Sequence, residues 1–417
     1  MSSSDNFNEF ENAIETSELR GHSKNSILLA FSKLFERASY YGIRAILILY
    51  ASTNDTFVFE TSDLIFLFGF FTGSVTLAQI LGGIVGDLWL VNKRTALMGG
   101  LMQLVGAVLL CFPYIQMFYL GIGLVGVGTG FHYSNFNALY GKSYLKRLKS
   151  LDSGFVLLHG FVNLGSFVGI MMLSYLSEKW SFTAGFICAG VMSIFSVLLL
   201  FLSKQRDLKN IVLPKLKLST RFLKISMILL FFIGFWLGHQ LLSPDLFYVT
   251  DEISKSVETG ILSGASINSL NSLFVALSAI LLFIFWTFFH WNRYLKMGLG
   301  LVLGLTSFAL ILNVSPDLTE SDLVIFVVSI ALLGMAEVLI TPTLSSAVVR
   351  YVSPKYFAIV FGLLFIPSRL TAVFSRLFEN ENGEFTEWSL DFGIGLFIVL
   401  SALGFLYSFI DHKYVKN

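Results

Sequence analysis

The sequence predicts an all-α polytopic membrane protein with about twelve transmembrane helices. The 417-residue chain has a mean hydropathy of +0.75, and only 13% of its residues are charged. Soluble domains carry roughly 25% charged residues, and a soluble fold of this length could not hide so much apolar surface. Lipid is the solvent that suits such a composition.

Each predicted helix is a run of about 20 mostly apolar residues, the length that crosses the hydrocarbon core of a bilayer. The runs cover approximately residues 26–51, 63–88, 95–115, 117–141, 153–177, 181–203, 222–248, 265–290, 295–314, 322–347, 356–378 and 391–411. Their length favours helices over the strands of a β-barrel, which would span about ten residues with alternating polarity.

The loops between these runs predict the orientation of the chain. Loops on one side carry Lys93, Arg94, Lys142, Lys146, Arg147, Lys149, Lys204, Arg206, Lys209, Lys215, Lys217, Arg221, Arg293, Lys296, Arg350, Lys355, Lys413 and Lys416. Loops on the other side carry Lys179, Lys255, Asp55, Glu60, Glu379, Glu381, Glu384 and Glu387. Because basic loops stay inside, we expect both termini in the cytoplasm and the protein in the cytoplasmic (inner or plasma) membrane.

The longest basic loop separates two halves of six predicted helices each. The expected organisation is a cytoplasmic tail 1–25, a bundle 26–203, a linker 204–221, a bundle 222–411 and a tail 412–417. The first tail is polar and acidic and lacks the features of a signal peptide. Two such halves are typical of transporters that rock around a central site.

A glycine-rich, charged motif supports this organisation. The segment 83–94 contains Gly83, Gly86, Asp87, Lys93 and Arg94. It resembles the loop between helices two and three of the major facilitator superfamily. The resemblance implies that fold, with the motif bracing the cytoplasmic gate.

The first predicted helix holds more charge than lipid tolerates. Each ionisable group at mid-membrane costs about 2.5–3.5 kcal/mol on insertion scales, so it must face a cavity or a partner. The polar residues are Lys33, Glu36, Arg37, Tyr40 and Arg44, flanked by Tyr41. At ~100° per residue the first five share one stripe about 100° wide, which predicts a helix facing a water-filled cavity. Local pairing that only holds helices together is the alternative.

Further polar groups mark the later helices. Glu337 is the one acid of the tenth run, with Pro342 just after it, and its partner must come from another helix, a ligand or a proton. Other polar residues share helix faces: His159 with Asn163, Asn268 with Asn271, and Trp236 with His239, Gln240 and Ser243. Each of these could equally be an interhelical hydrogen bond without a substrate role.

Three segments are similar to signatures of the proton-dependent oligopeptide transporter family. Phe35–Tyr50 resembles that family's first helix, with its pattern E-x-x-E-R-F-x-Y-Y-G followed by Arg. Gly128–Asn135 resembles its G-x-G-x-x-K-P-N segment, and Asp152–Ser166 its fifth helix ending F-Y-x-x-x-N-x-G. The resemblance identifies the chain as a divergent member.

The resemblance implies a central cavity for short peptides. Arg44 and Asn163 would hold the peptide carboxylate, and Glu337 with Asn271 the amino group. The pocket would be lined by Tyr40, Tyr41 and Trp236. A zwitterionic peptide needs such opposite charges at its two ends, and the guanidinium fork of arginine suits a carboxylate.

Several positions depart from the family pattern. The chain has Lys33 for a Glu, Tyr133 for a Lys, Ser134 for a Pro, His159 for a Tyr and Gln240 for an acid. The family's neutral proton-coupling cluster corresponds to Lys33, Glu36, Arg37 and Tyr133, which sum to +1. A pair of Lys33 with Glu36 would lie within one helix and would not break as the halves rock. This departure argues against proton coupling by the family's route. The resemblance implies that the coupling or gating residues are Glu36, Arg37, Lys33, Tyr133, His159 and Gln240.

These features predict a secondary active transporter that imports di- or tripeptides with protons by alternating access. Two alternatives remain: a transporter of another small solute without the family's proton coupling, and a non-transporting subunit of a membrane complex with a protein partner. The sequence contains no nucleotide loop, metal-ligand cluster or nucleophile arrangement, so we expect no enzyme, cofactor or metal. A net charge of +1 gives no case for nucleic acid. The expected partners are a short peptide, protons and membrane lipids.

Overall fold

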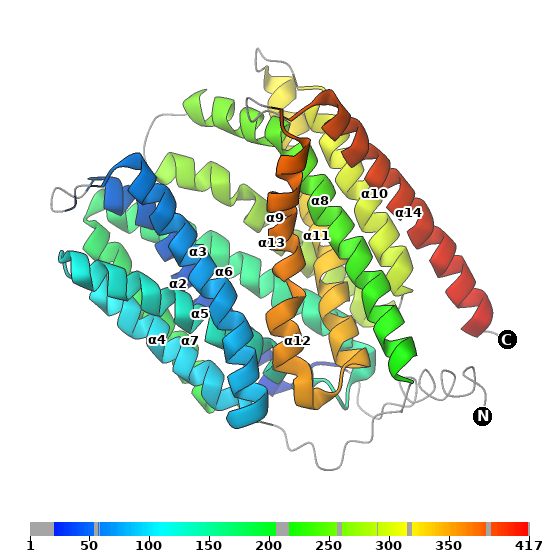
Figure 1. The fold of residues 1–417 in the computed structure, drawn as a ribbon, viewed down its shortest axis with the longest axis horizontal. Helices are drawn as coiled ribbons and strands as arrows, with labels where there is room; N and C mark the ends of the chain where they lie inside the picture. Colours follow the sequence, from blue (N-terminus) through cyan, green and yellow to red (C-terminus); the bar gives the residue numbers. More distant parts are fainter. Residues whose placement is uncertain are drawn as a thin grey trace.

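A computed structural model describes residues 21–53, 57, 59–205, 217–256, 261–289, 291–314, 319–380 and 385–415. Most of the predicted N-terminal tail and of the linker 204–221 lies outside these residues. Within the described ranges the chain is almost entirely helical (Figure 1), and its sole extended pairing is an isolated bridge between Glu379 and Phe385. This confirms the all-α prediction.

The helices follow the predicted apolar runs. The first half contains α2 (Lys24–Thr53), α3 (Thr61–Ile84) with the π-helical turn η1 (Val85–Trp89), α4 (Asn92–Leu109), α5 (Ile115–Ser143), η2 (Leu148–Ser150), α6 (Leu151–Lys179) and α7 (Phe182–Leu202). The second half contains α8 (Leu218–Ser256), α9 (Ile261–Phe288), α10 (Arg293–Ile311), α11 (Glu320–Tyr351), η3 (Pro354–Tyr356), α12 (Phe357–Leu364), α13 (Ile366–Phe374), η4 (Ser375–Phe378) and α14 (Glu387–Val415).

Ten helical segments of the described chain are long and apolar enough to cross a membrane. The predicted first and third spans, α2 and α4, fall outside that set. Helix α2 is 30 residues long but carries its stripe of charges, and α4 is only 18 residues long and opens with two cations. Both pack among the spanning helices, α2 against α6 and α7 and α4 against α5. They therefore complete the twelve transmembrane helices of the two six-helix halves.

The two halves meet through a few helices. Figure 1 shows α2–α7 mainly on one side of the molecule and α8–α14 on the other. Helix α6 packs against α9, and α3 and α5 pack against α12. At one end of the molecule α3 and α12 approach each other, and toward the other end the ribbons of α3 and α13 diverge (Figure 1).

The eleventh transmembrane segment is divided, which the prediction of one continuous run over 356–378 missed. Helix α12 ends at Leu364, Phe365 has non-helical backbone angles, and α13 begins at Ile366 with Pro367 in its first turn. Pro367 has no N–H to donate to the Leu363 carbonyl one turn earlier, and its ring crowds that carbonyl, which explains the break. Pro342, by contrast, lies inside the unbroken α11.

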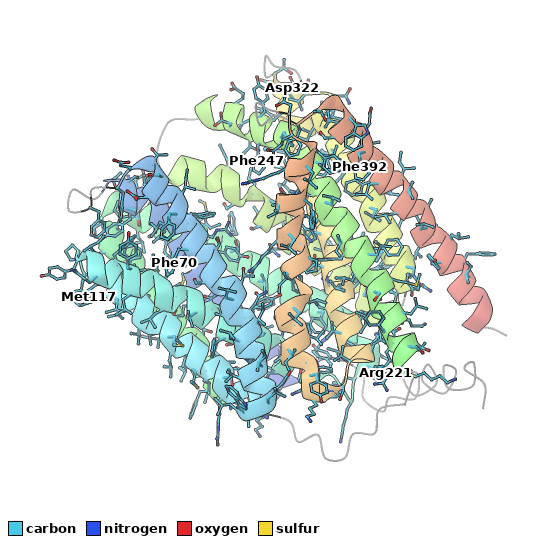
Figure 2. All side chains as sticks on the ribbon, viewed as in Figure 1. Phe70, Met117, Arg221, Phe247, Asp322 and Phe392 are labelled. Atoms are coloured by element: carbon cyan, nitrogen blue, oxygen red, sulfur yellow. The ribbon has the colours of Figure 1, made fainter. Side chains whose placement is uncertain are left out.

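The outer surface is that of a lipid-facing protein. Exposed apolar side chains cover the outward faces of the helices, among them Phe70, Met117 and Phe392, labelled in Figure 2. Figure 2 also shows Asp322, at the start of α11, and Arg221, near the start of α8, at opposite ends of the molecule. We call the end with Arg221 the basic end and the end with Asp322 the acidic end.

Candidate functional site

A cavity of about 360 Å³ lies between the two halves. Helices α2, α3, α5 and α6 line it from the first half, and α8, α11 and α13 from the second. Most predicted site residues line this cavity: Lys33, Arg37, Tyr40, Tyr41, Arg44, Tyr133, His159, Asn163, Trp236 and Glu337. The polar stripe of α2 thus faces the cavity, because a helix turns these positions onto one side.

A buried charge cluster occupies the wall formed by α2. The Glu36 carboxylate lies 2.9 Å from Lys33 Nζ, and Arg37 donates to both of its oxygens. Lys33 and Glu36 are each only 1% exposed. Nδ1 of His132, on α5, lies 3.4 Å from Lys33 Nζ and 3.7 Å from the carboxylate. All of these residues belong to the first half, so rocking of the halves would leave the cluster intact.

Tyrosine rings cover the cations of this cluster. The Arg37 guanidinium carbon lies 4.9 Å from the ring centre of Tyr40, 5.7 Å from that of Tyr41 and 5.9 Å from that of Tyr133. Lys33 Nζ lies 5.2 Å from the centre of the Tyr133 ring. Such cation–π contacts are each worth about 0.5–2 kcal/mol, depending on desolvation. Tyr133, which replaces the family lysine, therefore accommodates a cation supplied by α2.

A second charged group joins the two halves. Glu337 Oε1, on α11, lies 3.1 Å from Nε2 of His159, on α6. Asn163, one turn along α6, donates to the backbone oxygen of His159 at 3.0 Å and lies 3.3 Å from the same ring nitrogen. Both members of the His159–Glu337 pair are mostly buried, with side chains 13% and 16% exposed. The acid that had no partner on its own helix thus finds one on another helix.

Two arginines face the cavity without a carboxylate. The Arg44 guanidinium carbon lies 5.3 Å from the ring centre of Phe68. Arg369, on α13, donates to Gln79 Oε1 at 3.3 Å and to the hydroxyl of Thr76. In the described part of the chain, no acid lies within ion-pair distance of either arginine. The sequence analysis missed Arg369, although a cation two residues after Pro367 in an apolar run is a visible signal.

Three of the residues predicted for substrate binding or coupling do not line the cavity, and one of them, Glu36, lies directly behind the wall formed by α2. Asn271, on α9, and Gln240, on α8, are partly buried away from its lining. The side chain of Asn268 is not among those described. Within the described chain, buried polar atoms without a protein partner include Asn271 Oδ1, Trp236 Nε1 and Thr341 Oγ1. Of these three residues, Trp236 and Thr341 line the cavity, where water or a solute can satisfy such groups.

The glycine-rich motif contacts the opposite half at the basic end. Asp87 accepts hydrogen bonds from the Ile359 backbone N–H at 2.9 Å and from Asn92 Nδ2 at 3.0 Å. A Cβ at Gly83 would stand 2.5 Å from the backbone oxygen of Ala358, so only glycine permits this approach of α3 to α12.

The cations of the motif play a different part. Lys93 donates to the backbone oxygens of Phe201, at 2.9 Å, and Ser203, at 2.5 Å. These residues end α7, so Lys93 caps exposed carbonyls at a helix C-terminus. Arg94 is exposed at the same end. The motif therefore divides into residues that join the halves and residues that brace the first half.

A third contact joins the halves at the basic end. Asp152, at the start of α6, lies 2.7 Å from Lys296 on α10 and 3.0 Å from Arg350 on α11. One carboxylate thus holds two cations of the other half. Together with the Gly83 and Asp87 contacts, this trio ties the two halves together at the basic end.

Two six-helix halves around a charged cavity define a membrane transport protein. A family model described as "Major Facilitator Superfamily" matches residues 29–375. The chain therefore belongs to the Major Facilitator Superfamily.

Sequence relatives show which transporters of the superfamily this chain resembles. An uncharacterized transporter, YclF, of Bacillus subtilis (strain 168) is 29% identical over 192 residues, 45% of this chain and 39% of the relative. The dipeptide and tripeptide permease B of Aliivibrio fischeri (strain MJ11) is 31% identical over 174 residues, 40% of this chain and 35% of the relative. The matches thus span well under half of the relatives' own length.

Solved structures agree in fold. The chain is similar to the POT family transporter PepTSo, with a TM-score of 0.59 and 16% identity over 94% of this chain and 99% of that one. It is similar to a peptide transporter POT in complex with sulfate, with a TM-score of 0.59 and 18% identity over 97% and 98%. These solved structures show a shared fold, and the sequence matches to dipeptide and tripeptide permeases confirm the resemblance to the proton-dependent oligopeptide transporter family.

Proposed function

We propose that this protein is a secondary active transporter that imports di- or tripeptides together with protons. The observation that carries the proposal is a single cavity that presents Arg44 on the first half and Glu337 on the second. A short peptide carries one carboxylate and one amine, so it can bridge these two groups and pull the halves together. Alternating access requires a ligand that contacts both halves.

The proposed contacts use ordinary charge complementarity. Arg44 offers the peptide carboxylate two parallel N–H donors, assisted by the Asn163 amide. Glu337 accepts from the peptide amine. Tyr40, Tyr41 and Trp236 would supply aromatic walls, and the unpartnered Trp236 N–H is a donor for a peptide carbonyl.

We assign proton coupling to the His159–Glu337 pair. The Lys33–Glu36–Arg37 cluster lies on α2 alone and would stay unchanged as the halves rock, whereas the His159–Glu337 pair joins α6 to α11. Binding of a peptide amine at Glu337 would displace His159, and a proton on either group decides whether the pair forms. A contact that breaks and reforms between the halves is what coupling needs.

The basic end supports an orientation. Basic loops face the cytoplasm, so the end where Asp152 and Asp87 join the halves would be cytoplasmic, both termini would lie there, and a peptide would enter from the acidic end. The membrane would be the cytoplasmic membrane of the cell.

The test is uptake of a labelled dipeptide into proteoliposomes, with and without an inward proton gradient. Accumulation above equilibrium that depends on the gradient is the expected result. Equilibration without accumulation would contradict proton coupling and leave a facilitator. No uptake by protein shown to be folded would contradict peptide transport.

Site variants test the assigned roles. Arg44→Lys and Glu337→Gln are each expected to abolish uptake without loss of folded protein. Glu320→Gln is the matched control, because Glu320 lies on the same helix as Glu337 but is exposed in its first turn at the acidic end. Normal uptake by both site variants would remove the central-site assignment.

A further inference from the structure

We propose that the cavity selects short peptides with an acidic side chain, and that Arg369 binds the side-chain carboxylate. This inference rests on the proposed peptide transport and deepens it by naming the substrate class. Arg369 is thereby a specificity residue, distinct from Arg44, which serves the carboxylate common to all peptides.

The charge of the cavity points to an anionic substrate. Four cations line it: Lys33, Arg37, Arg44 and Arg369. Within the described chain, only two carboxylates offset them: Glu337 in the lining and Glu36 directly behind it. A neutral, zwitterionic peptide would leave this surplus of two positive charges in place. A peptide with one acidic side chain reduces it.

Arg369 is placed for this role by the break in the eleventh segment. Gln79, fully buried on α3, donates to the Gly362 oxygen of α12 at 3.0 Å and accepts from Arg369 on α13 at 3.3 Å. The same amide therefore holds both sides of the break. It turns Arg369 toward the cavity wall formed by α2 and α3, although Arg369 belongs to the second half.

Arg369 and Arg44 converge on one region. Both arginines line the same cavity as Tyr40 and Arg37. Arg37 is already bound to Glu36, whereas Arg44 rests on an aromatic ring and Arg369 bonds only neutral oxygens. Two guanidinium groups with unused donors in one cavity can receive two carboxylates of one small molecule.

The retained positive charge is difficult to explain by packing alone. Two hydrogen bonds to the neutral oxygens of Thr76 and Gln79 could be made by an uncharged donor without placing a cation at membrane depth. Arginine has five N–H donors, and a planar fork matches a carboxylate. A substrate carboxylate supplies the counter-charge that the described protein lacks.

The experiment compares two peptides that differ only in charge, Ala-Glu and Ala-Gln. Binding is measured as ligand-induced thermal stabilisation and by competition against a labelled dipeptide in proteoliposomes. The wild-type protein is expected to bind Ala-Glu about tenfold or more tightly than Ala-Gln, since a charge-assisted contact is worth that much. Arg369→Gln is expected to lose the preference while it still binds Ala-Gln.

Two controls separate the possible failures. Arg44→Lys is expected to weaken both peptides alike, because both carry the terminal carboxylate. Equal affinity of the wild type for the two peptides would overturn the inference and leave the proposed function standing. A preference that persists in Arg369→Gln would overturn the assignment to Arg369. Failure of folded wild-type protein to bind either peptide would overturn both proposals.

Discussion

Replacement of Glu36 by Gln is expected to destabilise the protein by about 3–5 kcal/mol. The carboxylate is 1% exposed and is the shared partner of Lys33 and Arg37. Its neutralisation leaves two buried cations side by side, which costs the desolvation of both without any compensating attraction. The matching change of Lys33 to Met should be neutral or stabilising, since it removes the surplus cation and leaves the Glu36–Arg37 pair intact.

Stability is measured by thermal unfolding and by denaturant titration of both variants in the same detergent. The expected order places Glu36→Gln lowest, with Lys33→Met at or above the wild type. Lys33 and Met have similar length, so the second variant also tests whether the aliphatic stem alone fills the space between Tyr133 and Phe136. The reasoning would be refuted if Lys33→Met lost more stability than Glu36→Gln.

Three further predictions concern the basic end. Ser345, on α11, lines the cavity and can be changed to Cys as a reporter. Asp152→Asn removes the shared partner of two cations and should raise the rate at which a thiol reagent added from the basic end labels this cysteine, whereas Asp152→Glu should raise it less. Gly83→Ala inserts a Cβ 2.5 Å from a backbone oxygen and should raise the same rate, while Gly69→Ala, with nothing within 4 Å, should not. Burial, and then the charge of Arg147, lower the pKa of His22, so its contacts should hold above about pH 6.5 and weaken as the pH falls through the lowered pKa.

A specific result would refute each of these three predictions. Unchanged labelling in Asp152→Asn would mean that access from the basic end does not depend on this carboxylate. Equal labelling rates in Gly83→Ala and Gly69→Ala would mean that the close approach of α3 to α12 does not limit access of the reagent to the cavity. For His22, the measurement is hydrogen exchange of the Gly21 amide, which is bound to Ser150 Oγ at 2.9 Å. If the protection factor of the Gly21 amide keeps the same pH dependence in His22→Gln, the assignment to His22 is contradicted.

The sequence predicted the α2 face of the site well because its signal is local. Helical periodicity and the cost of charge in lipid together require Lys33, Glu36, Arg37 and Arg44 to share a side and to face something polar. The His159–Asn163 pair is local in the same sense. The same helical spacing placed Asn271 and Gln240 on polar faces, but spacing does not say what a face meets, and neither residue lines the cavity.

The missed features are long-range. Asp152 lies 144 residues from Lys296 and 198 from Arg350, and nothing in a single sequence couples such positions. Arg369 stood within a run that was interpreted as one continuous helix. The break at Phe365 and the Gln79 bridge, 283 residues from Gly362, are what direct its side chain. Tertiary packing therefore determines both the ion pairs of Asp152 and the direction of the Arg369 side chain.

The exchange of a lysine between helices has a spatial explanation. The family pattern places a cation on its fourth helix, and here that position is Tyr133. Lys33 reaches from α2 to within 5.2 Å of the Tyr133 ring centre, so positive charge returns to nearly the same place from another helix. Lys33 is paired with Glu36 of its own helix, so it cannot be the group that pairs with Glu337 in one state of the transport cycle and separates from it in another. His159 is the described group that meets Glu337 across the halves, at 3.1 Å. Loss of the lysine on the fourth transmembrane helix and gain of a histidine on the fifth are therefore two parts of one rearrangement.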